Sequence, residues 1–256
     1  MTGLRPGQLT ELAARAAAAI GDVVKPGGGP AVIGPYKSVA MVVALIRANL
    51  TQEVAGGIFS CSQATVSRRW DLLRPAIGQV LASCVPDPRQ IPGGGTALAD
   101  GTIAPTRDRA AIPDLFPGKA GYPGMNLQIA ATPGGRVAAT GAVPVHGARH
   151  DAHAFQASGL KNLPAAADPG YTGVDGIAIV PFRTPPGRRL HDSQAASSKE
   201  LSGIRAAAER AAATVKTWRM LPEEGSRYRA PVSKYGEMLA AVTGLFFFSN
   251  NYDPYK

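Results

Sequence analysis

The chain has 256 residues, with 27 Lys and Arg against 18 Asp and Glu and a formal net charge of +9. Hydrophobic residues make up 45% of the sequence, which supports a packed core and excludes wholesale disorder. The two cysteines exclude a disulfide scaffold, and their spacing does not fit a zinc site. A basic balance of this size favours polyanionic partners.

Segments that would enter or cross a membrane are not evident in the sequence. The best apolar run, residues 38–46, stops at Arg47 and is shorter than the roughly 18 residues that span a bilayer. The Ala-rich N-terminal stretch is interrupted by Glu11 and Arg15, unlike the apolar centre of a secretion signal. We therefore expect a cytoplasmic protein with no membrane partner.

The N-terminal third of the sequence carries helical patterns and predicts a small all-α domain. Residues 9–20 and 37–50 form two candidate helices. Residues 51–70 follow with the pattern of a helix-turn-helix, in which two short helices cross at a tight turn. Thr51 and Ser62 stand at the two helix starts, and both are N-capping residue types.

The helix-turn-helix pattern assigns a role to each side of the motif. Gly56 is the small residue expected where the two helices cross, and apolar contacts would come from Ile58, Phe59 and Val66. The second helix would present these side chains to DNA: Gln63, Ser67, Arg68 and Arg69. A plain helical hairpin with solvated arginines is the alternative, and the motif alone fits a transcription regulator equally well.

A Pro- and Gly-rich segment separates two regions of different pattern. Residues 89–95 cannot continue a helix and predict a linker between a helical DNA-binding domain at 1–88 and a second domain at 96–256. Expected strands of the second domain are 97–103, 126–131, 136–145, 163–167 and 177–182, with a hairpin turn at 133–135, and its expected helices are 193–220 and 234–248. This order predicts a mixed α/β fold.

Three acidic residues of the second domain have positions that suit metal binding. Asp100 ends an apolar strand, Asp168 follows another, and Glu209 lies within the expected helix at 193–220. Carboxylate oxygens are the ligands that hard cations prefer. If the three acids converge, they could hold two Mg²⁺ ions about 4 Å apart, an arrangement that cleaves and joins phosphodiesters.

Helix geometry places Glu209 beside an apolar stripe. The stripe comprises Ile204, Ala208, Ala211, Val215 and Trp218. Arg205, Glu209 and Lys216 follow one another on the adjacent face, where the cations could meet phosphates while the glutamate meets a metal. The alternative is an Arg205–Glu209 ion pair on a solvated face, worth about 0.3–0.5 kcal/mol.

These short motifs follow a fixed order along residues 51–250. After the helix-turn-helix come Asp100-Gly101-Thr102, His150-Asp151, Asp168-Pro169-Gly170-Tyr171-Thr172-Gly173, and the spaced Arg205, Glu209 and Lys216. The order resembles bacterial insertion-sequence transposases of the DDE superfamily, in particular DDE endonuclease families with an N-terminal helix-turn-helix. The resemblance implies an RNase H-like catalytic core, with Asp100 on its first strand and Asp168 at the end of its fourth.

The same resemblance implies a DNA transposase that cuts and joins phosphodiester bonds at transposon ends. Asp100, Asp168 and Glu209 would be catalytic residues and ligands of two Mg²⁺ or Mn²⁺ ions, while Lys119, Arg205 and Lys216 would hold phosphates. Double-stranded DNA of the transposon ends and the target would be the partner, in a nucleoid-associated bacterial protein able to form a homo-oligomer. The glycine clusters lack the Gly-Lys-Ser/Thr ending of a phosphate loop, so no nucleotide cofactor is expected.

The sequence departs from the resembled pattern at three places. Pro169 stands where relatives tend to have a basic residue, and Ser202 stands at the position of a tyrosine. In the loop 116–124, Lys119 is what remains of a more basic family loop. These departures affect the handling of DNA ends rather than the expected metal ligands.

Three of the four histidines gather in residues 146–153, which invites a transition-metal interpretation. In the resembled family only the His-Asp pair recurs, at the start of a helix after the third strand. We therefore expect Asp151 in a first helical turn, where the helix dipole favours it, and His150 near the active site as accessory residues. Two further functions stay open: a DNA-binding regulator that does not cut, and a metal-dependent nuclease without strand transfer.

Overall fold

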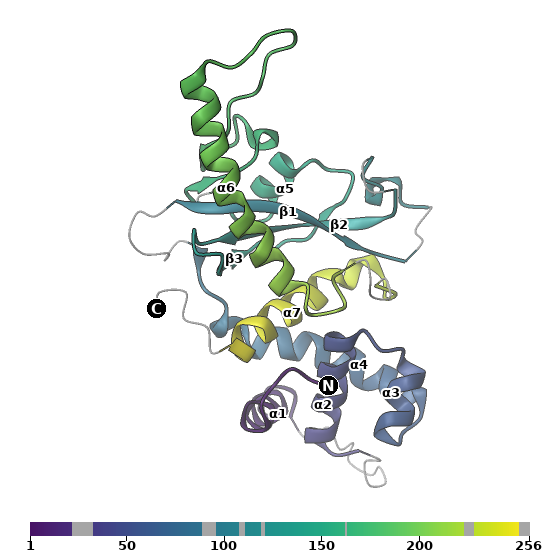
Figure 1. Ribbon diagram of the computed structural model, residues 1–256. Coiled ribbons are helices and arrows are strands. Elements are labelled where there is room, and N and C mark those ends of the chain that lie inside the picture. Colours follow the sequence, from purple (N-terminus) through teal and green to yellow (C-terminus); the bar gives the residue numbers. More distant parts are fainter. Residues whose placement is uncertain are drawn as a thin grey trace. The chain divides into compact units, whose positions relative to one another are not determined.

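The computed structural model describes residues 1–21, 33–88, 96–107, 111–118, 121–161, 163–222 and 228–250 (Figure 1). The chain divides into two compact units: Met1–Val85 with Thr217–Tyr252, and Pro86–Lys216. The boundary after Val85 falls close to the one expected at residue 88. The boundary after Lys216 groups the C-terminal helix with the N-terminal helices, although that helix was expected in the second domain. The linker predicted at 89–95 lies outside the described residues.

The first unit is helical. It contains α1 (Pro6–Ile20), α2 (Pro35–Ala48), α3 (Gln52–Phe59), α4 (Gln63–Val80), η1 (Ala82–Cys84), η5 (Val232–Lys234) and α7 (Tyr235–Asn250). The helices predicted at 9–20, 37–50 and 234–248 are confirmed, with ends shifted by a few residues. α7 is apolar on nearly all sides and buried along most of its length, and it packs against α4.

Two glycines let α4 and α7 approach closely. A Cβ added at Gly78 would lie 3.1 Å from the Cβ of Ala240, and one added at Gly244 would lie 2.7 Å from the Cβ of Leu81. Real Cβ atoms need more room than this second distance, so the helix contact requires a residue without a side chain at Gly244.

The second unit is built around a mixed sheet. Its strands are β1 (Ala97–Pro105), β2 (Gly124–Ala131), β3 (Val137–Thr140), β4 (Val145–His146), β5 (Ala165–Ala166) and β6 (Ile177–Ile179). The order is β3-β2-β1-β5-β6, and β4 pairs with β2. β2 pairs antiparallel with both β1 and β3, whereas β5 pairs parallel with both β1 and β6. A mixed sheet of this order, flanked by helices, is compatible with an RNase H-like core.

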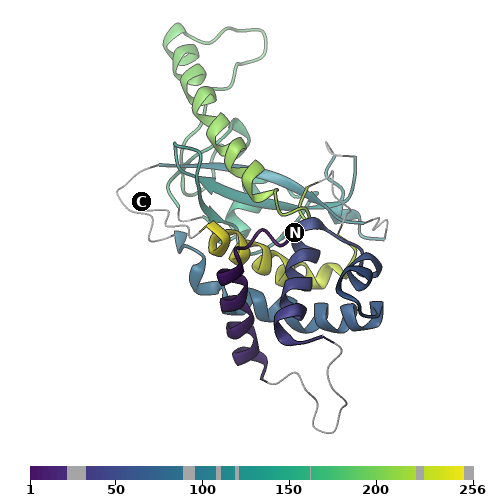
Figure 2. The same cartoon turned by 60° about the horizontal axis from the view of Figure 1, so that its bottom comes forward.

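Helices cover both faces of the sheet (Figure 1). α5 (Asp151–Ala157) contributes Phe155 to a buried cluster that includes Ala99 and Tyr171. α6 (Asp192–Val215) packs on the opposite face, and the N-terminal half of α6 extends beyond the sheet in both views (Figure 1, Figure 2). Side chains alternate along a strand, so each residue of β1 faces either α5 or α6.

Three expected strands are shorter in the structure: the one expected at 163–167 is reduced to β5, and the other two are shortened for identifiable reasons. The segment predicted as one strand at 136–145 divides into β3 and β4, because the amide of Ala142 donates to the carbonyl oxygen of Ser158 at 2.9 Å. This bond takes the chain away from the sheet. The strand predicted at 177–182 is reduced to β6, which stops before Pro181, a residue with no amide hydrogen for a ladder bond.

The helix predicted at 193–220 ends at Val215. Beyond it, the amide of Arg219 donates to the carbonyl oxygen of Arg47 at 3.0 Å, and the guanidinium of Arg47 lies 5.1 Å from the ring centroid of Trp218. Trp218 is buried but belongs to this non-helical turn, so its placement in the helical stripe was wrong. Ala208, Ala211 and Val215 are buried as predicted, and the side chain of Ile204 lies outside the described residues.

Candidate functional site

Asp100 lies in the middle of β1, opposite Ile129 of β2. Its neighbours Ala99 and Gly101 face α5: Ala99 packs in the cluster that contains Phe155, and a Cβ at Gly101 would lie 2.3 Å from an oxygen of Asp151. Because side chains alternate, Asp100 faces the side of the sheet covered by α6. The structure thus places Asp100 on the first strand, as the resemblance implied.

Asp168 follows β5 and caps the short helix η4 (Pro169–Tyr171). Its Oδ1 accepts a hydrogen bond from the amide of Gly170 at 2.7 Å, and its Oδ2 lies 3.7 Å from Nη2 of Arg205 in α6. Both the carboxylate and the guanidinium are about one-third exposed (33% and 35%), so solvent screens this ion pair in part. Arg205 therefore links α6 to the turn that carries Asp168.

The charges of this region act most strongly on Asp100. Burial raises the pKa of its carboxyl group above the usual value, the nearby carboxylates of Asp151 and Asp168 raise that pKa further, and Arg205 and the Gly101 amide lower it. Burial, followed by the same three carboxylates, also raises the pKa of Tyr171. These shared effects show that Asp100, Asp151, Asp168 and Arg205 lie in one electrostatic neighbourhood.

Glu209 does not join this group of acids. Its side chain is exposed on α6, one turn beyond Arg205, and the guanidinium of Arg205 contacts Asp168. Among the residues that the structure describes, no three or more His, Cys, Asp or Glu side chains lie close enough to hold a metal ion together. The structure therefore brings together two of the three predicted acids.

Asp100 and Asp168 nevertheless have the donor chemistry of a divalent-cation site. Carboxylate oxygens suit Mg²⁺ and Mn²⁺, and both side chains keep partial access to solvent. Burial is the main cause of the raised pKa of Asp100, and the carboxylates of Asp151 and Asp168 raise that pKa further. A bound cation would relieve this repulsion, so the two residues fit such an ion.

The N-terminus of α5 lies beside these acids. His150 is the N-cap, and its Nδ1 accepts from the amide of His153 at 3.2 Å. Asp151 occupies the first helical turn, which confirms the prediction for this residue. Asp151 accepts a hydrogen bond from Nδ2 of Asn126 at 2.8 Å. His146 lies on β4, and its carbonyl oxygen accepts from the amide of Arg149 at 3.0 Å.

Sequence reasoning missed three polar residues behind the site. Asn126, Gln128 and Tyr171 are each at most 2% exposed and are joined to one another by hydrogen bonds. A signal was available, since an Asn and a Gln two residues apart in an otherwise apolar strand face the same side of a sheet.

Two arginines, Arg205 of α6 and Arg183, lie beside the turn that carries Asp168. Arg183 donates from Nη2 to the carbonyl oxygen of Pro169, so a cation lies beside the turn at which Pro169 replaces the basic residue of relatives. Lys216 is half-buried and caps the C-terminal end of α6. Ser202 is exposed on α6 and donates to the carbonyl oxygen of Ser198 at 2.8 Å. Lys119 lies outside the described residues.

In the helical unit, α3 and α4 are joined by residues 60–62. Thr51 and Ser62 cap the two helices through the amides of Val54 and Thr65, which confirms both capping predictions. Ser60 adopts the left-handed conformation, with φ of 54°. A Cβ at Gly56 would lie 2.7 Å from the carbonyl oxygen of Cys61, so this position requires glycine, as predicted.

Of the three apolar contacts predicted between these helices, one is fully formed. Val66 is completely buried, whereas Phe59 is half-buried. Ile58 is 46% exposed, so its assignment as a contact was wrong. Ile58 lies in the last turn of α3, whose buried residues are Ala55 and Gly56.

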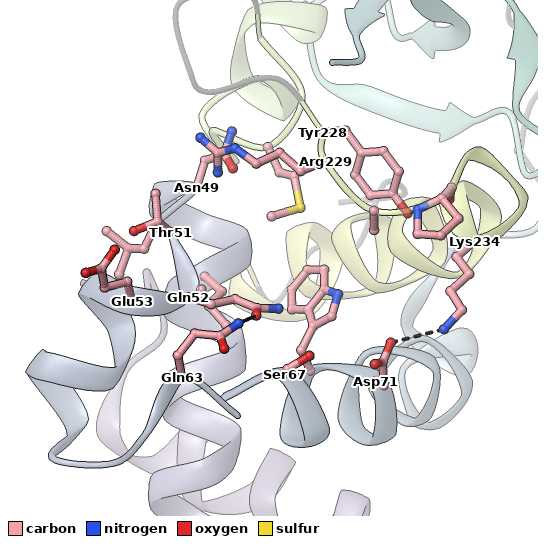
Figure 3. Close-up of a pocket in the computed structure, with 16 residues that line it drawn as sticks. Asn49, Thr51, Gln52, Glu53, Gln63, Ser67, Asp71, Tyr228, Arg229 and Lys234 are labelled. Atoms are coloured by element: carbon pink, nitrogen blue, oxygen red, sulfur yellow. Dashed lines mark hydrogen bonds and ion pairs between the residues drawn. The ribbon is translucent and has the colours of Figure 1, made fainter. Parts of the chain in front are cut away.

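The four residues expected to face DNA have different surroundings. Arg68 and Gln63 are exposed, whereas Ser67 and Arg69 are half-buried. Gln63 and Ser67 line a cavity of about 650 Å³, together with Trp70, Asp71 and residues of the segment 228–234 (Figure 3). Two contacts cross this cavity's rim: Gln63 Nε2 donates to Gln52 Oε1 at 2.5 Å, and Lys234 Nζ donates to Asp71 Oδ1 at 3.1 Å.

Comparisons with known proteins place this geometry in a family. No helix among the described residues has the length and apolar character needed to cross a membrane. No curated protein and no solved structure matches the chain. A family model for DDE superfamily endonucleases matches residues 99–246, more than half of the chain, and this range contains Asp100, Asp168 and Glu209. The chain therefore belongs to the family of DDE superfamily endonucleases.

Proposed function

We propose that this endonuclease is a DNA transposase, which cuts and joins phosphodiester bonds at the ends of a mobile DNA element. The observation that carries the proposal is the pairing of Asp100 and Asp168 within a chain of this family. The two acids come from neighbouring strands, and a cation from α6 contacts one of them. An acid with a raised pKa, such as Asp100, beside the arginine of α6 suits a polyanionic substrate.

Asp100 and Asp168 would hold divalent cations, Mg²⁺ or Mn²⁺, and Glu209, which lies outside this pair in the structure, is the third ligand that the resemblance implies. When bound, two such ions would supply the Lewis-acid chemistry for in-line displacement at a phosphodiester. Arg205 orients the carboxylate of Asp168 through their contact at 3.7 Å and offsets part of the negative charge at Asp100. Arg205, Lys216 and Lys119 would bind phosphate oxygens of the DNA near these acids.

We further propose that α3 and α4 form a helix-turn-helix that binds DNA. The capped helices, the left-handed Ser60 and the required Gly56 support this interpretation. In this arrangement the N-terminal turns of α4 would present Gln63, Ser67 and Arg68 to the major groove, and Arg69 would lie beside the DNA backbone.

The test is cleavage and joining of DNA that carries the ends of the element, in the presence of Mg²⁺ or Mn²⁺. Asp100→Asn, Asp168→Asn and Glu209→Gln each retain shape but remove a ligand charge, and each should abolish cleavage. Asp175→Asn and Glu200→Gln are matched controls, because both side chains are exposed and Glu200 lies on the same helix as Glu209. Full cleavage by Asp100→Asn or by Asp168→Asn would contradict the proposed active site.

One observation favours a second function, a DNA-binding regulator that does not cut. No group of three metal-ligating side chains is assembled in the part of the chain that the structure describes, as expected for a relative that has lost catalysis. The same experiment separates the two functions. Sequence-dependent DNA binding without cleavage in either metal would support the regulator, whereas cutting without joining would indicate a nuclease.

A further inference from the structure

A continuous chain of hydrogen bonds crosses the α5 face of the sheet. The hydroxyl of Tyr171 donates to Oε1 of Gln128 at 2.8 Å, and Nε2 of Gln128 donates to Oδ1 of Asn126 at 2.8 Å. Nδ2 of Asn126 donates to Oδ1 of Asp151 at 2.8 Å and to the carbonyl oxygen of Arg149 at 3.1 Å. We call Tyr171, Gln128, Asn126 and Asp151 the buried polar chain.

The direction of these bonds follows from the carboxylate at one end. A carboxylate only accepts hydrogen bonds, so the amide nitrogen of Asn126 must face Asp151. The amide oxygen of Asn126 then faces Gln128, whose own oxygen is left to accept from the hydroxyl of Tyr171. Each link therefore fixes the orientation of the next, and the chain has a single satisfied arrangement.

Both ends of the buried polar chain contact a segment that carries a proposed metal ligand. Gly101, which follows Asp100, pairs directly with Gln128 across the sheet, and a Cβ at Gly101 would lie 2.3 Å from Asp151 Oδ1 and 2.7 Å from Gln128 Nε2. β1 thus lies against the chain. At the other end, Tyr171 closes the helix η4 that Asp168 begins, and the amide of Tyr171 donates to the carbonyl oxygen of Asp168 at 3.1 Å.

Core packing alone would not select these residues. Asn126 and Gln128 are 2% and 1% exposed, and apolar side chains of similar volume would fill the same space without the cost of desolvating two amides. Buried polar groups that are fully hydrogen-bonded specify one arrangement of the elements that they join. Here the joined elements are β1, β2, η4 and the start of α5.

We propose that the buried polar chain is a positioning device that holds Asp100 and Asp168 at the separation required to share a divalent cation. This inference rests on the proposed function of those two acids. Asn126, Gln128, Tyr171 and Asp151 act through β1 and η4, from the face opposite to Asp100, and are positioning residues rather than ligands. Outer-shell partners of metal sites have this effect on affinity in general.

The first test removes one end of the chain. Tyr171→Phe retains the ring that packs edge-to-face on Phe155 but leaves Oε1 of Gln128 without its donor. Mn²⁺ binding to the full chain, measured by calorimetry, should weaken about 10- to 100-fold, and kcat for cleavage should fall while KM for DNA stays constant. The matched control is Tyr235→Phe, because its buried hydroxyl has no hydrogen-bond partner among the described atoms. The control should bind Mn²⁺ as the natural protein does.

The second test reverses one bond of the chain. Asn126→Asp sets two carboxylates against each other and should weaken Mn²⁺ binding and lower the melting temperature. Adding Asp151→Asn restores a carboxylate–carboxamide hydrogen bond with the same net charge as the natural sequence, and it should recover Mn²⁺ affinity to within a few-fold. This pair keeps the inference testable if Tyr171→Phe does not fold.

Three results would overturn the inference. Unchanged Mn²⁺ affinity in Tyr171→Phe or Asn126→Asp would show that the chain has no role in positioning. Recovery of the melting temperature without recovery of Mn²⁺ affinity in the double variant would do the same. A natural protein that neither binds Mn²⁺ nor cuts DNA would overturn the proposed function itself, and the inference with it.

Discussion

Two charged residues, Arg74 in the helical unit and Asp100 in the second unit, have opposite surroundings. Arg74 in α4 is 1% exposed; its Nη2 lies 2.5 Å from Oε2 of Glu237 in α7, and its guanidinium lies 5.2 Å from the ring centroid of Trp70. Asp100 in β1 is half-buried, and burial, together with the nearby carboxylates of Asp151 and Asp168, raises its pKa. Arg74 is thus matched with an opposite charge, whereas Asp100 is placed among like charges.

The difference indicates what each charge contributes. An ion pair between the buried Arg74 and the exposed Glu237 joins α4 to α7, and removal of the carboxylate leaves the buried charge less compensated, which costs stability. A carboxylate beside other carboxylates weakens the fold when it is ionised, so its presence points to a function. We therefore expect Arg74 and Asp100 to respond in opposite ways to substitution.

The largest effect on stability should come from Glu237→Gln. This substitution removes the nearer of two carboxylates beside the buried Arg74, since Asp71 Oδ1 lies 3.7 Å from its Nη1 and Glu237 is itself 44% exposed. It should lower the free energy of unfolding by about 2 kcal/mol, as for hydrogen bonds to buried charges. The control is Glu11→Gln, since Glu11 and Arg15 also lie 2.5 Å apart but are 49% and 38% exposed. Its cost should stay below about 1 kcal/mol. Equal losses in denaturant titrations would show that burial does not distinguish the two pairs.

Asp100→Asn should act in the opposite direction. Because the folded protein raises the pKa of Asp100, stability is lost as the pH rises from the unfolded value of 3.8 through the folded pKa. The variant should therefore be more stable at pH 7, by about 1 kcal/mol, the usual size of a stabilising substitution. The advantage should disappear below the unfolded pKa. Melting curves across this range check the prediction, and a destabilised variant at pH 7 would contradict it.

Arg205→Gln should sharpen the account of the charges around Asp100. Arg205 lowers the pKa of Asp100, so its removal should raise that pKa and move the acid limb of the pH–rate profile for cleavage to higher pH. Arg210→Gln is the control, because Arg210 is an exposed cation one turn further along the same helix. Acid limbs at the same pH in both variants would remove Arg205 from the site.

The smallest effect is expected for Arg68, an exposed cation of the helical unit. Arg68→Ala should leave the melting temperature within the small range of surface substitutions. If Arg68 contacts a phosphate, the slope of log affinity against log salt concentration should decrease by about 1. If Arg68 contacts a base, the substitution should instead cost about 1–3 kcal/mol of binding free energy at one base position. Unchanged affinity and unchanged sequence preference would return α3 and α4 to a plain helical hairpin.

The features predictable from sequence are those fixed by local chemistry. The caps at Thr51 and Ser62 depend on residues at most three positions away. Apolar segments likewise locate Asp100 within β1 and Asp168 just after β5. The end of α6 could not be predicted, because contacts of Arg47 with Trp218 and Arg219 determine it across the sequence.

The buried polar chain shows the same limit at the site. Asn126 and Gln128 are visible as polar residues in an apolar strand, but their partners follow from strand register and from the packing of α5. The position of Glu209 relative to Asp100 likewise depends on how α6 lies on the sheet. Its role as third ligand therefore stays a prediction that Glu209→Gln tests.

The central claim is that Asp100 and Asp168 form a divalent-cation site, and the thermal response to metal tests it most directly. Melting of the full chain should be measured with and without Mn²⁺ for the natural protein, Asp100→Asn and Asp168→Asn. At about 100 times the dissociation constant, Mn²⁺ should stabilise the natural protein by about 2.7 kcal/mol and should leave both variants unchanged. Equal stabilisation of all three proteins by Mn²⁺ would contradict the account.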